Sequence, residues 1–521
     1  MTEIVSLQKF GTPGFEAELR AEIPRGYMAP PANSALERAV SSWWLSPDEM
    51  RDGVWEPDGG VTLGYRGGRL IGCADNRHLL TIAGSRAGKG VSLIIPNLIH
   101  YKGSAVVVDP KGENAARTAR RRGTGPSSGA EGLNQKVYVL DPFGESGLPT
   151  HSFNPLQGLD PNSELLIEDI AMFADALIMH PEKGERHWTE SAQALLRALI
   201  LIVVTDPRFA DRKNLVTVRK LLMLTDPAVT TEAEAHELTA QGGLMRILLS
   251  QDHTRYSYIP KGVAHQLEAM GDNERGSVLS SARTQTQWLE SPVMERMLTE
   301  ANFDIGDLKR TNMTIYLCLP ASRMATHTRW LRLMILLALN VMERDKHDAE
   351  FPVLFVLDEF PTLGYMEAIE TAAGLMAGYG VKLWPIVQNL GQLQRHYRSS
   401  WQTFVANAGV VTAFSVSDKE TLDVLSGYLG QTMIQERGVR PQAGTEISSG
   451  QRRSEDERRP VPLLAHHELR LLFRRSKGRL LVFNVEENPA VVERFRYHSD
   501  LLFKDETGRL LYDPDPKYGS R

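Results

Sequence analysis

Short runs of apolar residues recur in the first third and the last two fifths of the chain, and each run ends in polar or glycine-rich residues. Runs of four to seven apolar residues without alternation are typical of strands buried on both faces of a parallel sheet. Stretches with helical periodicity separate them, which indicates an α/β fold with a mostly parallel central sheet. The expected strands are residues 79–82, 105–108, 137–140, 313–319, 353–357, 383–387, 410–414 and 480–485.

The middle of the chain has a different pattern. In residues 188–203, apolar side chains recur three and four positions apart, and residues 156–300 contain no run that predicts a buried strand. We therefore expect an all-α domain over residues 156–300, inserted into a discontinuous α/β domain of residues 56–155 and 301–521. Residues 1–55 are punctuated by proline and predict an irregular N-terminal extension. The polar stretch 438–460 predicts a mobile loop or hairpin.

Composition limits the class of protein. The 521 residues carry a net charge of −5, so contact with DNA would have to come from local basic patches. Two cysteines exclude a disulfide or zinc framework and favour a reducing cytoplasm. No window reaches about 18 uninterrupted apolar residues, so we expect no transmembrane segment. Residues 117–122 (RTARRR) are expected to be a solvated helix end, with a DNA-facing or intersubunit role as the alternative.

A glycine-rich loop, residues 83–90 (AGSRAGKG), lies between an expected strand and an expected helix. Backbone N–H groups of such a loop bind phosphate, and Lys89 would reach the β- and γ-phosphates. The loop departs from the common pattern at Ala83, which replaces a glycine, and at Gly90, which replaces the Ser or Thr that binds Mg²⁺. Ser92 is a poor substitute, and water or Ser85 stays open. The expected nucleotide contacts are Gly84, Ser85, Arg86, Gly88, Lys89, Gly90 and Val91.

Polar side chains follow two further strands. Asp358 and Glu359 follow the strand 353–357, at the edge where parallel sheets bind ligands. Asp358 would bind Mg²⁺ and Glu359 would activate water for ATP hydrolysis, whereas a solvated acidic turn is the alternative. Asp109, after the strand 105–108, is expected to add to the acidic side. Gln388 would sense the γ-phosphate, a role compatible with Asn389 capping the next helix.

These motifs, in this order, resemble the type IV secretion coupling proteins of the TraG type, the conjugative DNA-transfer ATPases. The resemblance rests on residues 82–98, 106–114 (VVVDPKGEN), 152–156, 188–192, 357–360, 377–381, 387–388 and 459–468. It implies a RecA-like P-loop ATPase domain with an inserted all-α domain, ATP and Mg²⁺ as cofactors, and a homo-hexamer. It further implies delivery of single-stranded DNA with an attached relaxase, or of protein effectors, to a type IV secretion channel. The all-α domain would meet the cargo.

Many members of this family have N-terminal transmembrane helices, and the sequence predicts none here, so we expect a protein held peripherally at the cytoplasmic face of the inner membrane. A hexameric motor needs a cation from the neighbouring subunit, and neither Lys382 nor Arg395 can be assigned to that role from the sequence. Two alternatives stay open. One is a cargo receptor gated by nucleotide with little turnover, and the other is a stand-alone DNA-translocating ATPase outside conjugation. Glu359 favours turnover, because nucleotide binding alone does not require it.

Overall fold

A large twisted sheet forms the centre of the protein. The computed structural model describes residues 12, 14–23, 42–50, 55, 57, 60–180, 186–225, 240–252, 254–437, 456–484 and 487–514. The sheet has eleven strands in the order β2-β1-β13-β12-β9-β3-β8-β7-β4-β6-β5. The seven from β9 to β5 are parallel to one another, and the four at the other end pair antiparallel.

The predicted buried strands are all present in the parallel part and its neighbour β12. All but β5 are buried along nearly their whole length, as strands covered on both faces are, whereas the edge strand β5 is buried only at Val139 and Leu140. The observed ends differ from the expected ones by at most two residues. The strands are β3 (His78–Ala83), β4 (Ala105–Asp109), β5 (Lys136–Leu140), β6 (Met313–Cys318), β7 (Val353–Leu357), β8 (Val381–Val387), β9 (Ala408–Phe414) and β12 (Arg479–Asn484).

The remaining strands of the large sheet were not predicted, whereas a hairpin was one of the two expectations for residues 438–460. The unpredicted strands are β1 (Val61–Arg66), β2 (Arg69–Cys73) and β13 (Ala490–Glu493). The separate two-stranded hairpin consists of β10 (Gln431–Arg437) and β11 (Asp456–Pro462). Glycine and charged residues interrupt the apolar pattern of β1 and β2, so a buried run is not visible in the sequence. The polar stretch 438–460 thus ends in strand β11, while its residues 438–455 lie outside the described part of the chain.

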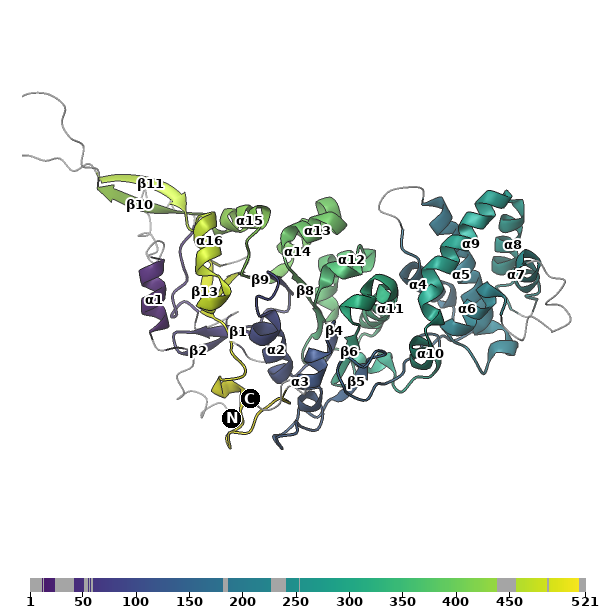
Figure 1. Ribbon diagram of the computed structural model, residues 1–521, viewed down its shortest axis with the longest axis horizontal. Coiled ribbons are helices and arrows are strands. Elements are labelled where there is room, and N and C mark those ends of the chain that lie inside the picture. Colours follow the sequence, from purple (N-terminus) through teal and green to yellow (C-terminus); the bar gives the residue numbers. More distant parts are fainter. Residues whose placement is uncertain are drawn as a thin grey trace, which may run out of the picture.

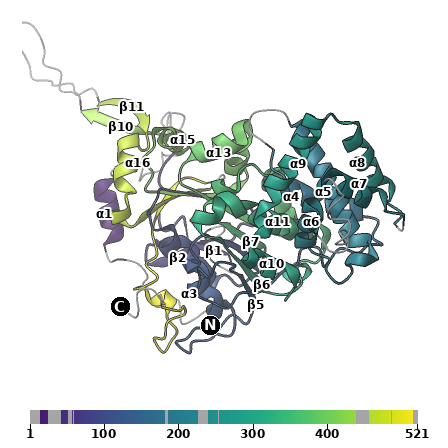
Figure 2. The same ribbon diagram turned by 45° about the vertical axis from the view of Figure 1, so that its right-hand side comes forward.

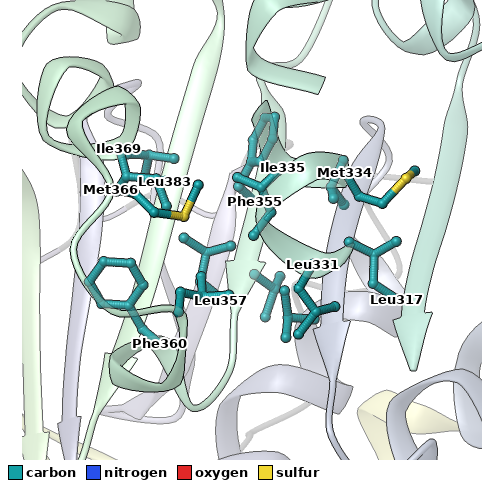
Figure 3. Close-up of a cluster of buried hydrophobic side chains, with 14 of the residues drawn as sticks. Leu317, Leu331, Met334, Ile335, Phe355, Leu357, Phe360, Met366, Ile369 and Leu383 are labelled. Atoms are coloured by element: carbon teal, nitrogen blue, oxygen red, sulfur yellow. The ribbon is translucent and has the colours of Figure 1, made fainter. Parts of the chain in front are cut away.

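Helices cover both faces of the sheet. Helices α2 and α3 lie on one face and α11–α14 on the other, as right-handed crossover connections require (Figure 1). Figure 3 shows how side chains of α11 pack on the sheet: Leu331 and Ile335 lie near Phe355 and Leu357, and Met334 lies beside Leu317. The bounds are α2 (Ile95–His100), α3 (Glu113–Arg122), α11 (Ala321–Arg344), α12 (Glu367–Leu375), α13 (Leu390–Tyr397), α14 (Trp401–Ala406), α15 (Lys419–Leu429) and α16 (His466–Leu472).

Further helices follow one another between β5 and β6 and gather at one end of the molecule (Figure 1 and Figure 2). Helix α5 is their core, since it packs against α4, α6, α8 and α9. The window of α5 that is apolar enough to cross a membrane is 72% buried within the protein. The bounds are α4 (Leu166–Leu177), α5 (His187–Thr205), α6 (Leu215–Met223), α7 (Ala240–Leu249), α8 (Tyr258–Ala269), α9 (Asp272–Thr286) and α10 (Pro292–Thr299).

The prediction of an irregular N-terminal extension is wrong for residues 15–22, which form helix α1 (Phe15–Glu22). Glutamates on α1 hold it to the antiparallel end of the sheet. Glu22 accepts a hydrogen bond from Arg479 at 2.8 Å, and Glu16 pairs with Arg66, whose side chain is fully buried. These partners are far away in the sequence, so the local pattern does not indicate them.

The prediction of a solvated helix end for residues 117–122 is also wrong in part. These residues are the end of α3, but Arg117 and Arg122 are buried. The guanidinium of Arg122 donates to the Thr314 hydroxyl at 2.6 Å and to backbone carbonyls of Leu98, Tyr101 and Gly103. Because these bonds satisfy the charge inside the protein, Arg122 holds the helix layer to the sheet and does not face solvent.

Candidate active site

The glycine-rich loop connects β3 to a helix, as predicted. It begins after Ala83 and runs into one π-helical turn, η3 (Gly90–Ile94), which continues as α2. Gly84 has no room for a side chain, because a Cβ atom there would lie 2.3 Å from the Ser415 carbonyl oxygen. Gly88 has a φ of +96°, which favours glycine. The loop therefore requires glycine at both positions.

The loop exposes hydrogen-bond donors at its outer side. Ser85 and Arg86 are exposed, and Arg86 takes the left-handed conformation with a φ of 55°. Within the described residues, the backbone N–H groups of Ser85, Arg86, Gly88 and Lys89 have no hydrogen-bond acceptor. Such successive free donors at a helix N-terminus form an anion-binding site. Val91 is half-buried and packs against a small apolar cluster under the helix.

The structure brings Lys89 together with both carboxylates that follow β7. Its Nζ atom lies 2.8 Å from Oδ1 of Asp358 and 2.7 Å from Oε1 of Glu359. Burial opposes the charge on Lys89, but the two carboxylates outweigh burial and raise its pKa. The lysine is therefore positively charged, and it holds the carboxylates of Asp358 and Glu359 close together at the carboxyl edge of the sheet.

Gln388 completes this cluster. Strand β8 lies between β3 and β7 in the sheet, so its end faces both the loop and the acidic pair. The Nε2 atom of Gln388 donates to Oε2 of Glu359 at 3.1 Å. Burial alone would raise the pKa of Glu359, but Lys89 and Gln388 outweigh burial and lower it. Asn389 caps α13, because its Oδ1 accepts a hydrogen bond from the Gln392 N–H at 3.0 Å, as expected.

Glu359 is held in an unusual backbone conformation. Its φ of 51° lies in the left-handed region, which costs about 1 kcal/mol or more for a residue with a side chain. Asp358 Oδ1 accepts the Glu359 N–H at 3.0 Å, and the Thr362 hydroxyl donates to the Glu359 carbonyl at 2.8 Å. These bonds fix the turn, so the Glu359 carboxylate is preorganised beside Lys89.

Asp109 lies next to this cluster, since β4 pairs with β7. It is buried, and its carboxylate accepts hydrogen bonds from the Ala115 N–H at 2.9 Å and from Asn114 Nδ2 at 3.3 Å. Burial, aided by the charge of Asp358, raises the pKa of Asp109 to about 7. In this structure Asp109 holds the first turn of α3, and its contribution to nucleotide binding stays a prediction.

Sequence reasoning missed Arg494, which lies behind the glycine-rich loop. Its guanidinium donates to the Ala87 carbonyl at 2.9 Å and to the Arg475 carbonyl at 2.8 Å. Ser92 is on the same side, since a Cβ atom on Gly88 would lie 3.7 Å from the Ser92 hydroxyl and 3.8 Å from Arg494 Nη1. No local pattern indicates Arg494, because it is 407 residues from the loop residue that it contacts.

These residues fit a nucleoside triphosphate and Mg²⁺. The free N–H groups and Lys89 suit phosphate oxygens, and Asp358 supplies a carboxylate for a hard cation. Over the described ranges, no group of three or more His, Cys, Asp or Glu side chains could enclose a metal alone. A metal here would depend on phosphate and water for its other ligands, as Mg²⁺ commonly does.

Comparisons with known proteins show the family of the chain. Residues 38–514 match the family model described as "Type IV secretory system Conjugative DNA transfer". Protein VirD4 of Rhizobium rhizogenes is 26% identical over 470 residues, which are 86% of this chain and 63% of the relative. The conjugal transfer protein TraG of Escherichia coli is 29% identical over 375 residues, 68% of this chain and 55% of the relative. The chain thus spans less than two thirds of the length of these curated relatives.

Solved structures show the same fold. The coupling protein TrwBdeltaN70, in complex with sulphate, is 16% identical with a TM-score of 0.62, covering 89% of this chain and 95% of that one. TrwB in complex with ADP and Mg²⁺ is also 16% identical, with a TM-score of 0.61 and coverage of 87% and 94%. The predicted RecA-like α/β fold with a mostly parallel sheet and an inserted all-α domain is confirmed. The chain belongs to the type IV secretory system conjugative DNA transfer family.

Proposed function

We propose that this protein hydrolyses ATP with Mg²⁺ and uses the energy to deliver cargo to a type IV secretion channel. The observation that carries the proposal is the cluster of Lys89, Asp358, Glu359 and Gln388 beside a loop of free N–H groups. A lysine, two carboxylates and an amide at the end of parallel strands provide the parts that phosphoryl transfer to water needs.

The chain's own residues divide the chemistry among them. The loop N–H groups and Lys89 hold the triphosphate and offset the charge that develops on the transferred phosphoryl group. Asp358 would hold a bound Mg²⁺, which would supply further positive charge to offset that of the phosphates. Glu359 orients the attacking water and accepts its proton, and Gln388 holds the Glu359 carboxylate from the loop side.

Lys89 must change partners during this cycle. It is bound to Asp358 and Glu359 here, and phosphate oxygens would replace at least one of these contacts. Glu359, released from Lys89, would then be free to accept a proton. Phosphate binding at Lys89 would therefore free the Glu359 carboxylate to act as the base.

Family membership and the coupling-protein relatives support the choice of cargo and place. The proposed cargo is single-stranded DNA with its attached relaxase, or protein effectors. The α4–α10 region, residues 156–300 in the proposed division, would meet this cargo, and residues 56–155 and 301–521 would form the motor. The proposed working state is a homo-hexamer at the cytoplasmic face of the inner membrane, beside the channel components.

ATP turnover of the full chain with and without single-stranded DNA tests the proposal, with the size of the assembly measured under the same conditions. The proposal expects turnover that rises with DNA and a larger assembly when DNA and ATP are both present. ATP binding without turnover under any of these conditions would favour the nucleotide-gated cargo receptor instead. A variant lacking residues 156–300 that still bound relaxase would contradict the cargo assignment.

A further inference from the structure

The back of the glycine-rich loop rests on segments from the far end of the chain. The Ser415 carbonyl, at the end of β9, lies against Gly84, and the Ser415 N–H donates to the Phe473 carbonyl at 2.8 Å. Phe473 follows α16, and the next turn is the 3₁₀ helix η10 (Arg475–Lys477). The loop is thus seated on the ends of β9 and α16 and on the strand β13 that precedes Arg494.

Arg494 ties these segments to the loop. Its side chain is buried, with 6% of the residue exposed, and it lies over the ring of Phe414 at 4.5 Å. One arm of its guanidinium binds the loop at the Ala87 carbonyl and the other binds η10 at the Arg475 carbonyl. Burying the Arg494 cation costs free energy, and the same burial lowers its pKa to about 10. A purely apolar side chain would fill the space behind the loop without this cost.

The hydrogen bond from Arg494 to the Ala87 carbonyl links the guanidinium to the anion-binding N–H groups of the loop. The Ala87 carbonyl and the Gly88 N–H belong to one peptide unit, and the Gly88 N–H is one of the free donors of the loop. A cation bound to the carbonyl end polarises the peptide and strengthens its N–H as a donor. The same cation adds positive potential behind the anion site, where protein surroundings screen it less than water does.

We propose that Arg494 is a positioning residue for nucleotide binding: it fixes the Ala87–Gly88 peptide with its N–H outward and supplies positive charge behind the phosphate loop. The inference rests on the proposed function, since it assumes that the loop binds the phosphates of ATP. It assigns to the residue that follows β13 a role in substrate affinity that the loop sequence does not contain.

Direct ATP-binding measurements on the full chain, by calorimetry, test the role of Arg494. Arg494→Met keeps the length of the side chain but removes its charge and both hydrogen bonds. We expect it to raise the Kd for ATP at least about tenfold, since hydrogen bonds from a charged group are worth that much. Arg494→Lys keeps the charge but cannot bridge both carbonyls and stack on Phe414 as the guanidinium does, so its Kd for ATP is expected to rise less than about tenfold and less than that of Arg494→Met. The control, Arg470→Met, removes an exposed arginine on α16.

Turnover separates positioning from folding. In Arg494→Met we expect KM to rise while kcat changes less, because Asp358, Glu359 and Gln388 are untouched. A merely structural role would lower the active fraction, so kcat would fall with KM unchanged. Native ATP affinity in Arg494→Met would overturn the inference. If that variant does not fold, an affinity loss beyond about tenfold in folded Arg494→Lys would overturn the charge argument. ATP binding absent from the natural protein would instead refute the proposed function.

Discussion

Replacing Glu359 by glutamine separates ATP binding from hydrolysis. The two side chains have the same shape, so the left-handed backbone at position 359 is equally strained in both. Glutamine cannot accept the proton of the attacking water, and the loss of a general base typically lowers turnover by about 10² to 10⁴. We therefore expect Glu359→Gln to hydrolyse ATP at least about 100-fold more slowly.

The same substitution should tighten ATP binding. Lys89 Nζ and Glu359 Oε1 are 2.7 Å apart. At that separation two unit charges attract by about 1.5 kcal/mol in water and about 6 kcal/mol at an effective dielectric constant of about 20. Both side chains remain partly hydrated, with 18% and 30% exposed, so desolvation offsets much of this attraction. A net loss of about 1 to 2 kcal/mol frees Lys89 for phosphate and lowers the Kd for ATP about 5- to 30-fold.

Phosphate release and calorimetric ATP binding measure the two effects on one preparation. Glu367→Gln is the matched control, because Glu367 is an exposed glutamate in the first turn of α12. It is expected to leave both quantities unchanged. Turnover of Glu359→Gln within a few-fold of the natural protein would refute the role of Glu359 as base. Weaker ATP binding in that variant would refute the exchange of partners by Lys89.

Three further predictions test other parts of the structure. Gly90→Ser should lower the Mg²⁺ concentration for half-maximal turnover, because the new hydroxyl would occupy the usual metal-binding position and a Cβ atom there meets nothing within 4 Å outside its own helix backbone. An unchanged Mg²⁺ titration would contradict this. Arg122→Met should lower the free energy of unfolding by about 3 kcal/mol or more in urea, because it leaves buried carbonyls unpaired; an unchanged midpoint would exclude that role. Between pH 5 and pH 8 the folded protein binds more protons at Asp109 than the unfolded chain does, since folding raises that pKa to about 7, so stability falls as pH rises. Asp109→Asn should reduce this fall in melting temperature, and an identical pH dependence would contradict the assignment.

The parallel part of the fold was predictable because most of its strands are buried on both faces. The run 353–357 is apolar at every position, and such a run is typical of a parallel strand whose two faces are both covered by helices. The antiparallel end was not predictable in the same way. Strand β1 and helix α1 depend in part on strand contacts and ion pairs with residues more than 400 positions away, for example Glu22 with Arg479. Local patterns contain no information about such partners.

The residues of the candidate site likewise fall into those whose positions the local sequence predicts and those whose positions depend on distant partners. Lys89, the acidic pair and Gln388 follow strands whose carboxyl ends must meet at one edge of a parallel sheet, so their proximity could be expected. The burial of Asp109 could not, because it follows from the hydrogen bonds that α3 directs at its carboxylate. Arg494 was equally inaccessible to sequence reasoning, since a lone arginine near the end of the chain carries no local sign of the loop that it supports.

The most direct test of the central claim is the rate of ATP hydrolysis by the full chain compared with Lys89→Ala, measured with saturating Mg²⁺. The loop, the lysine and the acidic pair are predicted to act as one site. The natural protein should therefore release phosphate well above background, and Lys89→Ala should fall to background because neither phosphate binding nor charge compensation remains. Equal rates in the two proteins, or no release by the natural protein with or without single-stranded DNA, would contradict the account.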